Sequence, residues 1–136
     1  MGVVSQRVIP ASEDFSMTKH TVRLIVDLAI NEGKLDTFEA LTQAMIAGSQ
    51  KEPGTLGYHW YLSADRKRCR LVETYADADA ELAHLGGPVV QELVPKVLGV
   101  ANVSGFEVYG DPGPKATEML MGFRAEIFHE WHVLNR

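Results

Sequence analysis

The chain has 136 residues, of which 46% are hydrophobic, and a formal net charge of -5 at pH 7. This length is typical of a single domain, and the hydrophobic fraction is sufficient for a packed core. The acidic balance gives no electrostatic reason to expect nucleic acid or an anionic membrane surface as a partner, and no apolar run is long enough to span a bilayer.

The single cysteine, Cys69, excludes an internal disulfide framework and fits a reducing compartment, so we expect a cytoplasmic protein. Residues 1–19 do not show a positively charged start that leads into a long apolar core, and we therefore expect no secretory signal there. We interpret residues 1–19 as an N-terminal arm, 20–110 as the folded domain, and 111–136 as an extension made of a short helix and an extended tail.

The first half of the domain predicts a strand over residues 20–30 and a helix over residues 34–50. Apolar residues alternate along the strand, and both of its faces are partly apolar, which predicts cover on both sides. In the helix, apolar residues recur at steps of three and four, and Pro53 and Gly54 end it.

Two further strands are expected at residues 56–63 and 68–75, joined by a hairpin. The aromatic content of the first favours a strand. The predicted strands orient their side chains as follows: Tyr58, Trp60 and Leu62 on one face of the first, His59 and Tyr61 on its other face, and Cys69, Leu71, Glu73 and Tyr75 on one face of the second.

The remaining elements alternate helix and strand. Asp77 is a good N-cap for a short helix over 78–85, and a second helix over 89–98 contains Pro95, which must bend it or delay its start. A fourth strand is expected at 100–109, where Gly105 marks a bulge or a close approach of another backbone. In the extension we expect a helix over 115–121, followed by an apolar segment at 125–133 that needs a docking surface.

Two β–α–β halves of this kind predict an α+β fold of the ferredoxin-like type, βαββαβ, with a four-stranded antiparallel sheet and helices on one face. Because the first strand is apolar on both sides, the open face of the sheet also needs cover. A second copy of the chain, related by a two-fold axis, is the natural cover, so a homodimer is expected.

Three motifs resemble the antibiotic biosynthesis monooxygenase family of dimeric α+β barrels over residues 20–109. They are Glu52-Pro53-Gly54-x-Leu56-x-Tyr58, Leu71-Val72-Glu73-x-Tyr75 and Ala80-x-x-x-His84, in this order. The resemblance implies dimers whose sheets pack face to face, and a small cavity between sheet and helices in each subunit. This chain departs from the family pattern at two positions. Val89 stands where many members carry a second histidine, and Glu81 stands where members often have an apolar residue.

Glu73 and His84 are the predicted catalytic pair. A carboxylate beside an imidazole fixes the tautomer of the ring and raises its basicity, which suits a general base. The alternative is a structural role, in which Glu73 and His84 form a buried hydrogen-bonded pair that only holds the short helix over 78–85 on the sheet. Tyr58, Trp60 and Tyr75 are the predicted walls of a substrate pocket, with a purely structural role in the core as the alternative.

No metal site and no cofactor are expected. Phe128-His-Glu-Trp-His132 is one residue short of the zinc motif His-Glu-x-x-His, and no third ligand is signalled nearby. The sequence also has no glycine-rich phosphate loop and no dinucleotide fingerprint.

The resemblance implies a cofactor-independent monooxygenase that acts on a small phenolic or quinol substrate, with His84 as base and Glu73 as the residue that orients it. Two alternatives remain open. One is an isomerase or lyase that acts on a small hydroxylated metabolite, and the other is a dimer that binds a small molecule without catalysis.

Overall fold

The computed structural model describes residues 21–136, so the predicted N-terminal arm lies outside the described residues. The elements follow in the order β1 (Val22–Ile30), α3 (Leu35–Ser49), β2 (Thr55–Leu62), β3 (Arg68–Tyr75), α4 (Ala78–Gly86), η1 (Val89–Leu93), α5 (Val94–Val97), β4 (Ala101–Tyr109), α6 (Gly113–Met121) and β5 (Glu126–Phe128). The predicted ferredoxin-like α+β fold is confirmed, with elements that begin and end within two residues of most predicted bounds.

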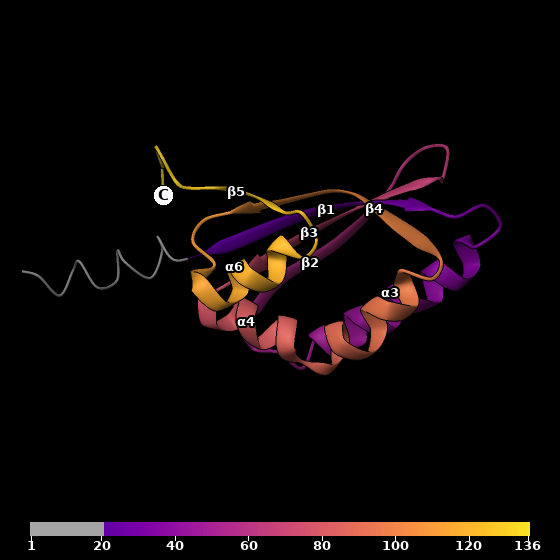
Figure 1. Ribbon diagram of the computed structural model, residues 1–136, viewed down its shortest axis with the longest axis horizontal. Helices are drawn as coiled ribbons and strands as arrows, with labels where there is room; N and C mark the ends of the chain where they lie inside the picture. Colours follow the sequence, from indigo (N-terminus) through magenta and orange to yellow (C-terminus); the bar gives the residue numbers. More distant parts are fainter. Residues whose placement is uncertain (1–20) are drawn as a thin grey trace, which may run out of the picture.

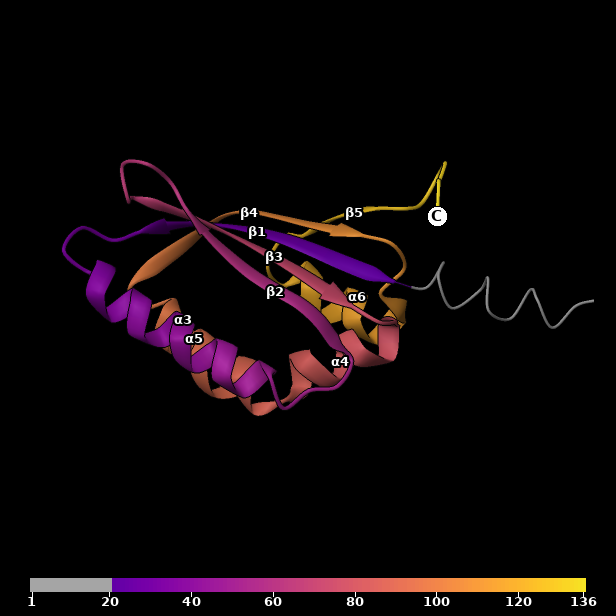
Figure 2. The ribbon, with the colours of Figure 1, turned by 180° about the vertical axis from the view of Figure 1, so that it is seen from behind.

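The sheet has five strands in the order β2-β3-β1-β4-β5, rather than the four that we expected. The first four are antiparallel, while β5 pairs in parallel with the end of β4. All the helices cover one face of the sheet, and no element of residues 21–136 covers the other face (Figures 1 and 2). The fifth strand was missed because three residues are too few for an alternating pattern to be recognised.

The core lies between the sheet and the helices. Val22, Leu24, Val26 and Leu28 of β1 point into it, as their alternation predicts. One cluster of buried side chains lies under α3 and α5, and a second lies under α4 and α6. The predicted need for cover on the opposite face of β1 is not met within residues 21–136.

A bulge in β4 decides which of its side chains reach the core. Asp27 pairs with Gly105 and the next residue, Leu28, pairs with Val103, so Ser104 is the extra residue. The bulge that we expected at Gly105 is therefore present, and a Cβ atom there would lie 3.2 Å from Oδ2 of the Asp27 side chain. Because one residue is inserted, Val103 and Phe106 lie on the same face of the sheet, although three positions separate them.

The predicted helix over 89–98 is divided into a π-helical turn, η1, and the short helix α5. Pro95 lies in the first turn of α5, where its missing N–H group is tolerated. The division follows from this proline, which cannot donate the hydrogen bond that a continuous helix requires.

The extension is only partly docked. Ala125 is buried and Ile127 is half-buried, but Trp131 is 87% exposed and Val133 is 52% exposed. The predicted docking surface for 125–133 therefore serves only the first part of this segment within one chain. Among residues 21–136, no helix has both the length and the apolar character needed to cross a membrane.

Candidate active site

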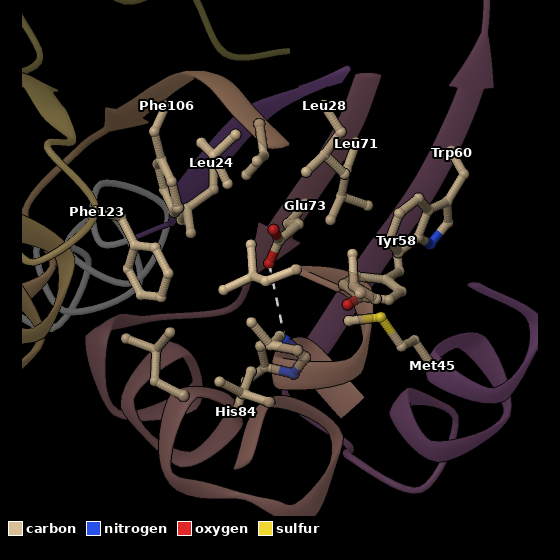
Figure 3. A pocket seen from close by; sticks show the side chains of 17 residues that line it. Leu24, Leu28, Met45, Tyr58, Trp60, Leu71, Glu73, His84, Phe106 and Phe123 are labelled. Carbon is tan, nitrogen blue, oxygen red and sulfur yellow. Dashed lines mark ion pairs between the residues drawn. The ribbon is translucent and has the colours of Figure 1, made fainter. Parts of the chain in front are cut away.

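A cavity of about 80 Å³ lies between the sheet and the helices, at the junction of the two core clusters (Figure 3). Its wall is almost entirely apolar, and the Glu73 carboxyl group and the His84 imidazole form part of it. The other lining residues are Leu24, Val26, Leu28, Met45, Tyr58, Trp60, Leu71, Leu85, Val90, Val94, Val97, Leu98, Val103, Phe106 and Phe123. An apolar enclosure with a few converging polar groups is typical of sites for small molecules.

Strand pairing brings three of the predicted site residues together. Tyr58 of β2 lies directly opposite Glu73 of β3, and Trp60 lies opposite Leu71. The rings of Tyr58 and Trp60 are 5.6 Å apart between centroids, in an edge-to-face arrangement. Glu73 is 5% exposed, so a carboxyl group is placed in the apolar wall between aromatic and aliphatic side chains.

Helix α4 carries His84 to the cavity. The helix begins at the predicted cap, since the side chain of Asp77 accepts a hydrogen bond from the Ala80 N–H group. His84 lies in the last turn and is 2% exposed. Its ring lies between two tyrosines, with centroid distances of 5.4 Å to Tyr58 and 5.3 Å to Tyr75.

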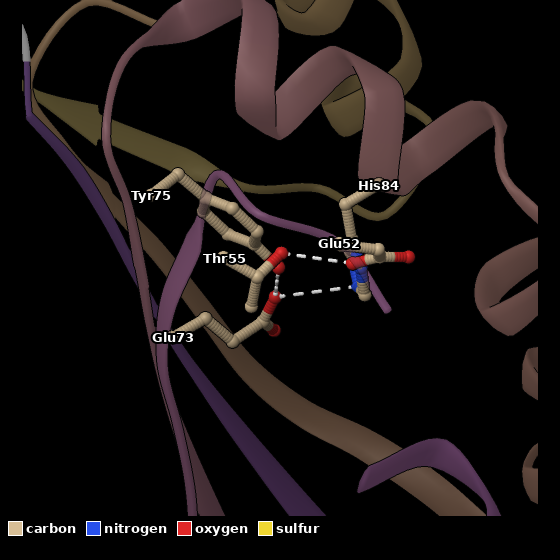
Figure 4. A network of polar contacts seen from close by, with 5 residues as sticks. All are labelled: Glu52, Thr55, Glu73, Tyr75 and His84. Atoms are coloured by element: carbon tan, nitrogen blue, oxygen red, sulfur yellow. Dashed lines mark hydrogen bonds and ion pairs between the residues drawn. The ribbon is translucent and has the colours of Figure 1, made fainter. Parts of the chain in front are cut away.

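The direct partner of the His84 ring is Glu52, which we did not predict as a site residue (Figure 4). His84 Nδ1 lies 2.7 Å from Glu52 Oε1, whereas His84 Nε2 lies 3.8 Å from Glu73 Oε1. The Thr55 hydroxyl donates to the same Glu52 oxygen at 2.8 Å. Glu52 thus accepts two hydrogen bonds, and this arrangement favours the tautomer with the proton on Nδ1 and an unprotonated Nε2 that faces Glu73 and the cavity.

The turn after α3 is what brings Glu52 to α4. Gly54 O accepts a hydrogen bond from the Ala76 N–H group, which ties the turn to the end of β3. A Cβ atom at Gly54 would lie 2.4 Å from the Cβ of Ala80, so only glycine allows α4 to approach this closely. Glu52 belongs to the Glu-Pro-Gly stretch that signalled the turn, but nothing local indicated the side chain that it meets.

The role that we predicted for Tyr75 does not match its position. Tyr75 is fully buried and is not among the residues that line the cavity. Its hydroxyl instead donates a hydrogen bond to Glu73 from outside the cavity wall. Burial and the charge of Glu73 raise the pKa of Tyr75, so the phenol stays protonated and remains a donor.

The pKa of Glu73 is raised above its ordinary value, chiefly by burial. The charge of His84 and the hydrogen bond from Tyr75 oppose the shift, while Glu52 adds to it. Burial also raises the pKa of Tyr58, which keeps this cavity residue neutral. The site therefore combines a neutral phenol, a desolvated carboxyl group and an imidazole, which are suited to moving a proton within an apolar enclosure.

A second buried carboxyl group, Glu81, lies on the same helix. It is 0% exposed, and neither of its oxygens has a hydrogen-bond partner among the described residues. Burial and then the charge of Glu73 raise its pKa to about 8. We noted Glu81 only as a departure from the usual apolar residue. Its full burial was not predicted.

Two aromatic residues of the wall come from β4 and the extension. Phe106 and Phe123 have ring centroids 5.8 Å apart, at an angle of 32°. Phe106 reaches the cavity because of the β4 bulge, and Phe123 because the chain turns back after α6. We did not predict either of them as a site residue.

The tail that contains His129 and His132 is exposed and distant in sequence from the pair. Within residues 21–136, no three His, Cys, Asp or Glu side chains lie close enough together to hold a metal ion. Cys69 is buried, and this burial raises its pKa to about 11, so it is a weak nucleophile.

Solved structures with the same fold include MupZ from Pseudomonas fluorescens, which is 27% identical, with a TM-score of 0.70 over 86% of this chain and 95% of that one. Rv0793 from Mycobacterium tuberculosis is 25% identical, with a TM-score of 0.61 over 69% of this chain and 97% of that one. A conserved protein from Methanosarcina mazei Go1 is 16% identical, with a TM-score of 0.63 over 70% and 96% of the two chains, and shows the fold alone. No curated protein sequence matches the chain.

The match to MupZ extends beyond the domain core. Residues 1–110 are about 81% of the chain, so a match over 86% must include part of the extension. The family model of antibiotic biosynthesis monooxygenases matches residues 21–96, which hold β1 through α4 and both members of the Glu73–His84 pair. With more than half of its length matched, this chain belongs to the antibiotic biosynthesis monooxygenase family.

Proposed function

We propose that this protein is a cofactor-independent monooxygenase that oxidises a small phenolic or quinol substrate with molecular oxygen. The observation that carries the proposal is the His84 ring, held by Glu52 on one side and facing Glu73 and an apolar cavity on the other. Family membership supports a small-molecule site of monooxygenase type.

The chemistry needs a base and a dry enclosure. His84 Nε2, with Glu73 beside it, takes a proton from the substrate, and the anion that forms is electron-rich enough to transfer one electron to O2. The resulting radical and superoxide combine into a peroxide anion, which takes the proton back from His84 and then loses water to leave a carbonyl group. One oxygen atom enters the product, and the other leaves as water with the two hydrogens that the substrate lost. The apolar wall supports the electron transfer to O2, because a buried anion is less stabilised by water and therefore more reducing.

In this proposal Glu52 orients the ring and favours the proton on Nδ1. Tyr58 and Trp60 are proposed walls of the substrate pocket, while Tyr75 supports Glu73 through its hydroxyl. A second copy of the chain is the proposed partner, and the face of the sheet opposite the helices is its proposed contact surface.

Oxygen uptake by metal-stripped protein tests the proposal, with hydroquinones, naphthoquinols and anthrones as substrates. We expect uptake that falls by about 100-fold or more in His84→Ala, the usual range for loss of a general base. His129→Ala, which removes an exposed histidine of the tail, is the matched control and should behave as the parent protein. Product that forms equally well without oxygen would replace the proposal by an isomerase or lyase, and stabilising ligands that are not consumed would replace it by a binding function.

A further inference from the structure

We propose that the C-terminal extension sets the size of the ligand that the cavity accepts, and that Phe123 is the specificity-determining residue. The inference deepens the proposed function and rests on it for the aromatic class of the ligand. The geometry that carries it is independent of the chemistry at Glu73 and His84.

Phe123 closes the cavity at the end opposite Trp60. In Figure 3, Phe106 and Phe123 lie on one side of the cavity, Met45 and Trp60 lie on the other, and the Glu73–His84 pair lies between them. A substrate whose acidic group meets the pair must therefore extend toward one aromatic end or the other. At the end formed by Phe106 and Phe123, the ring of Phe123 limits the length of the substrate.

The segment before Phe123 is firmly anchored. Ala116 and Leu120 of α6 are buried in the cluster under α4, with exposed fractions of 1% and 0%. The helix ends in a pair of capping hydrogen bonds, from Ala125 N to Leu120 O and from Arg124 N to Met121 O, which is the pattern of a Schellman motif. Arg124 takes the left-handed conformation, with φ of 59°, at the position where glycine is usual.

The segment after Phe123 is anchored as well. Ala125 is buried beside Leu120, and β5 then pairs with β4 at three positions, Val108 with Ile127 among them. Phe123 is thus held between a buried helix and the edge of the sheet. These contacts make it a fixed wall and exclude a freely hinged lid, because opening would break both anchors.

A fixed aromatic wall in a small cavity discriminates by size. The cavity of about 80 Å³ has little spare room, so a longer ring system would collide with Phe123. The family model covers residues 21–96 and therefore includes neither Phe106 nor Phe123.

Equilibrium binding of phenol, 1-naphthol and anthrone to the full chain tests the inference, with Phe123→Ala and Phe123→Leu as variants. Xenon serves as a further probe that does not depend on the ligand class, because apolar cavities bind it, and NMR shifts of the lining methyl groups report its binding. Met121→Ala removes an exposed apolar side chain of the same turn and is the matched control.

We expect Phe123→Ala to improve the affinity for anthrone relative to 1-naphthol by about tenfold or more, with a smaller gain in Phe123→Leu and none in Met121→Ala. Xenon should bind more tightly in Phe123→Ala. If no aromatic compound binds to any of the proteins but xenon binding rises, the proposed ligand class is wrong and the role of Phe123 as wall stands. Unchanged ligand ratios and unchanged xenon binding in a folded Phe123→Leu variant would overturn the inference.

Discussion

His84 Nδ1 and Glu52 Oε1 lie 2.7 Å apart, although 32 positions separate the two residues in the sequence. The turn at Gly54 and the last turn of α4 meet at this point, so this contact links the two β–α–β halves of the domain on the helical side of the sheet. The same contact sets which ring nitrogen faces the cavity. The position of the proposed base, His84, and the ring nitrogen that it presents to the cavity therefore depend on Glu52, a carboxylate outside the predicted Glu73–His84 pair.

Loss of the Glu52 carboxylate should affect both stability and the state of the ring. Glu52→Ala leaves a buried ring N–H group without its acceptor, and we expect the free energy of unfolding to fall by about 1–3 kcal/mol. Glu52→Gln keeps an acceptor and should be less destabilising, with a weaker preference for the proton on Nδ1. Urea unfolding and nitrogen-15 NMR of the imidazole measure the two effects. Glu39→Gln, on the exposed side of α3, is the control, and an unchanged tautomer in Glu52→Ala would contradict the assigned role.

Glu81 should make the fold less stable as the pH rises. Its pKa is raised from 4.5 to about 8 in the folded protein, so between these values the folded state binds more protons than the unfolded state. The free energy of unfolding should then fall by up to about 1.4 kcal/mol per pH unit in this window. Glu73, whose charge adds to the raised pKa of Glu81, itself has a raised pKa and contributes with the same sign.

Glu81→Gln keeps the shape of the side chain and removes its titration. We expect little change in stability near pH 4 and a clear gain at pH 8.5, measured by urea unfolding at both values. Glu118→Gln, an exposed residue of α6, should leave the pH dependence of the parent protein unchanged. Curves for Glu81→Gln that run parallel to those of the parent would show that Glu81 is not the titrating group.

Gly54→Ala should disturb α4 and with it the position of His84. The added methyl group would lie 2.4 Å from the Cβ of Ala80, so the helix must move, and we expect a loss of about 1–3 kcal/mol in stability. Gly86→Ala adds the same group where nothing lies within 4 Å of it, and it serves as the matched control. Thermal unfolding compares the stabilities of the two variants. An equally small loss in both would contradict the claim that the close approach at Gly54 requires glycine.

The open face of the sheet should mediate the proposed homodimer. Tyr61 projects from this face with 56% of its surface exposed, so Tyr61→Glu would bury a charge in the interface and should weaken self-association by about tenfold or more. Gln43→Glu adds the same charge on the exposed side of α3 and should have no effect. Sedimentation equilibrium measures both variants, and a parent protein that is monomeric at micromolar concentration would remove the dimer from the proposal.

The strands and helices were predicted well because their signals are local. Alternation along β1 and β3 oriented Leu24 and Glu73 correctly, and Asp77 marked the start of α4 through its own side chain. The bulge at Gly105 was also signalled by one residue type. The division at Pro95 followed from the missing N–H group of proline, which acts on its own turn of helix.

The sequence alone determined the fold class, the faces of the strands and the presence of Glu73 and His84 on elements that meet. Only the tertiary structure decided that Glu52 holds His84, that Tyr75 lies behind Glu73, that Glu81 is fully buried, and that Phe123 closes the cavity. The physical reason is distance along the chain. Hydrophobic periodicity and capping act over a few residues, whereas these contacts join segments that approach one another only when the helices pack on the sheet.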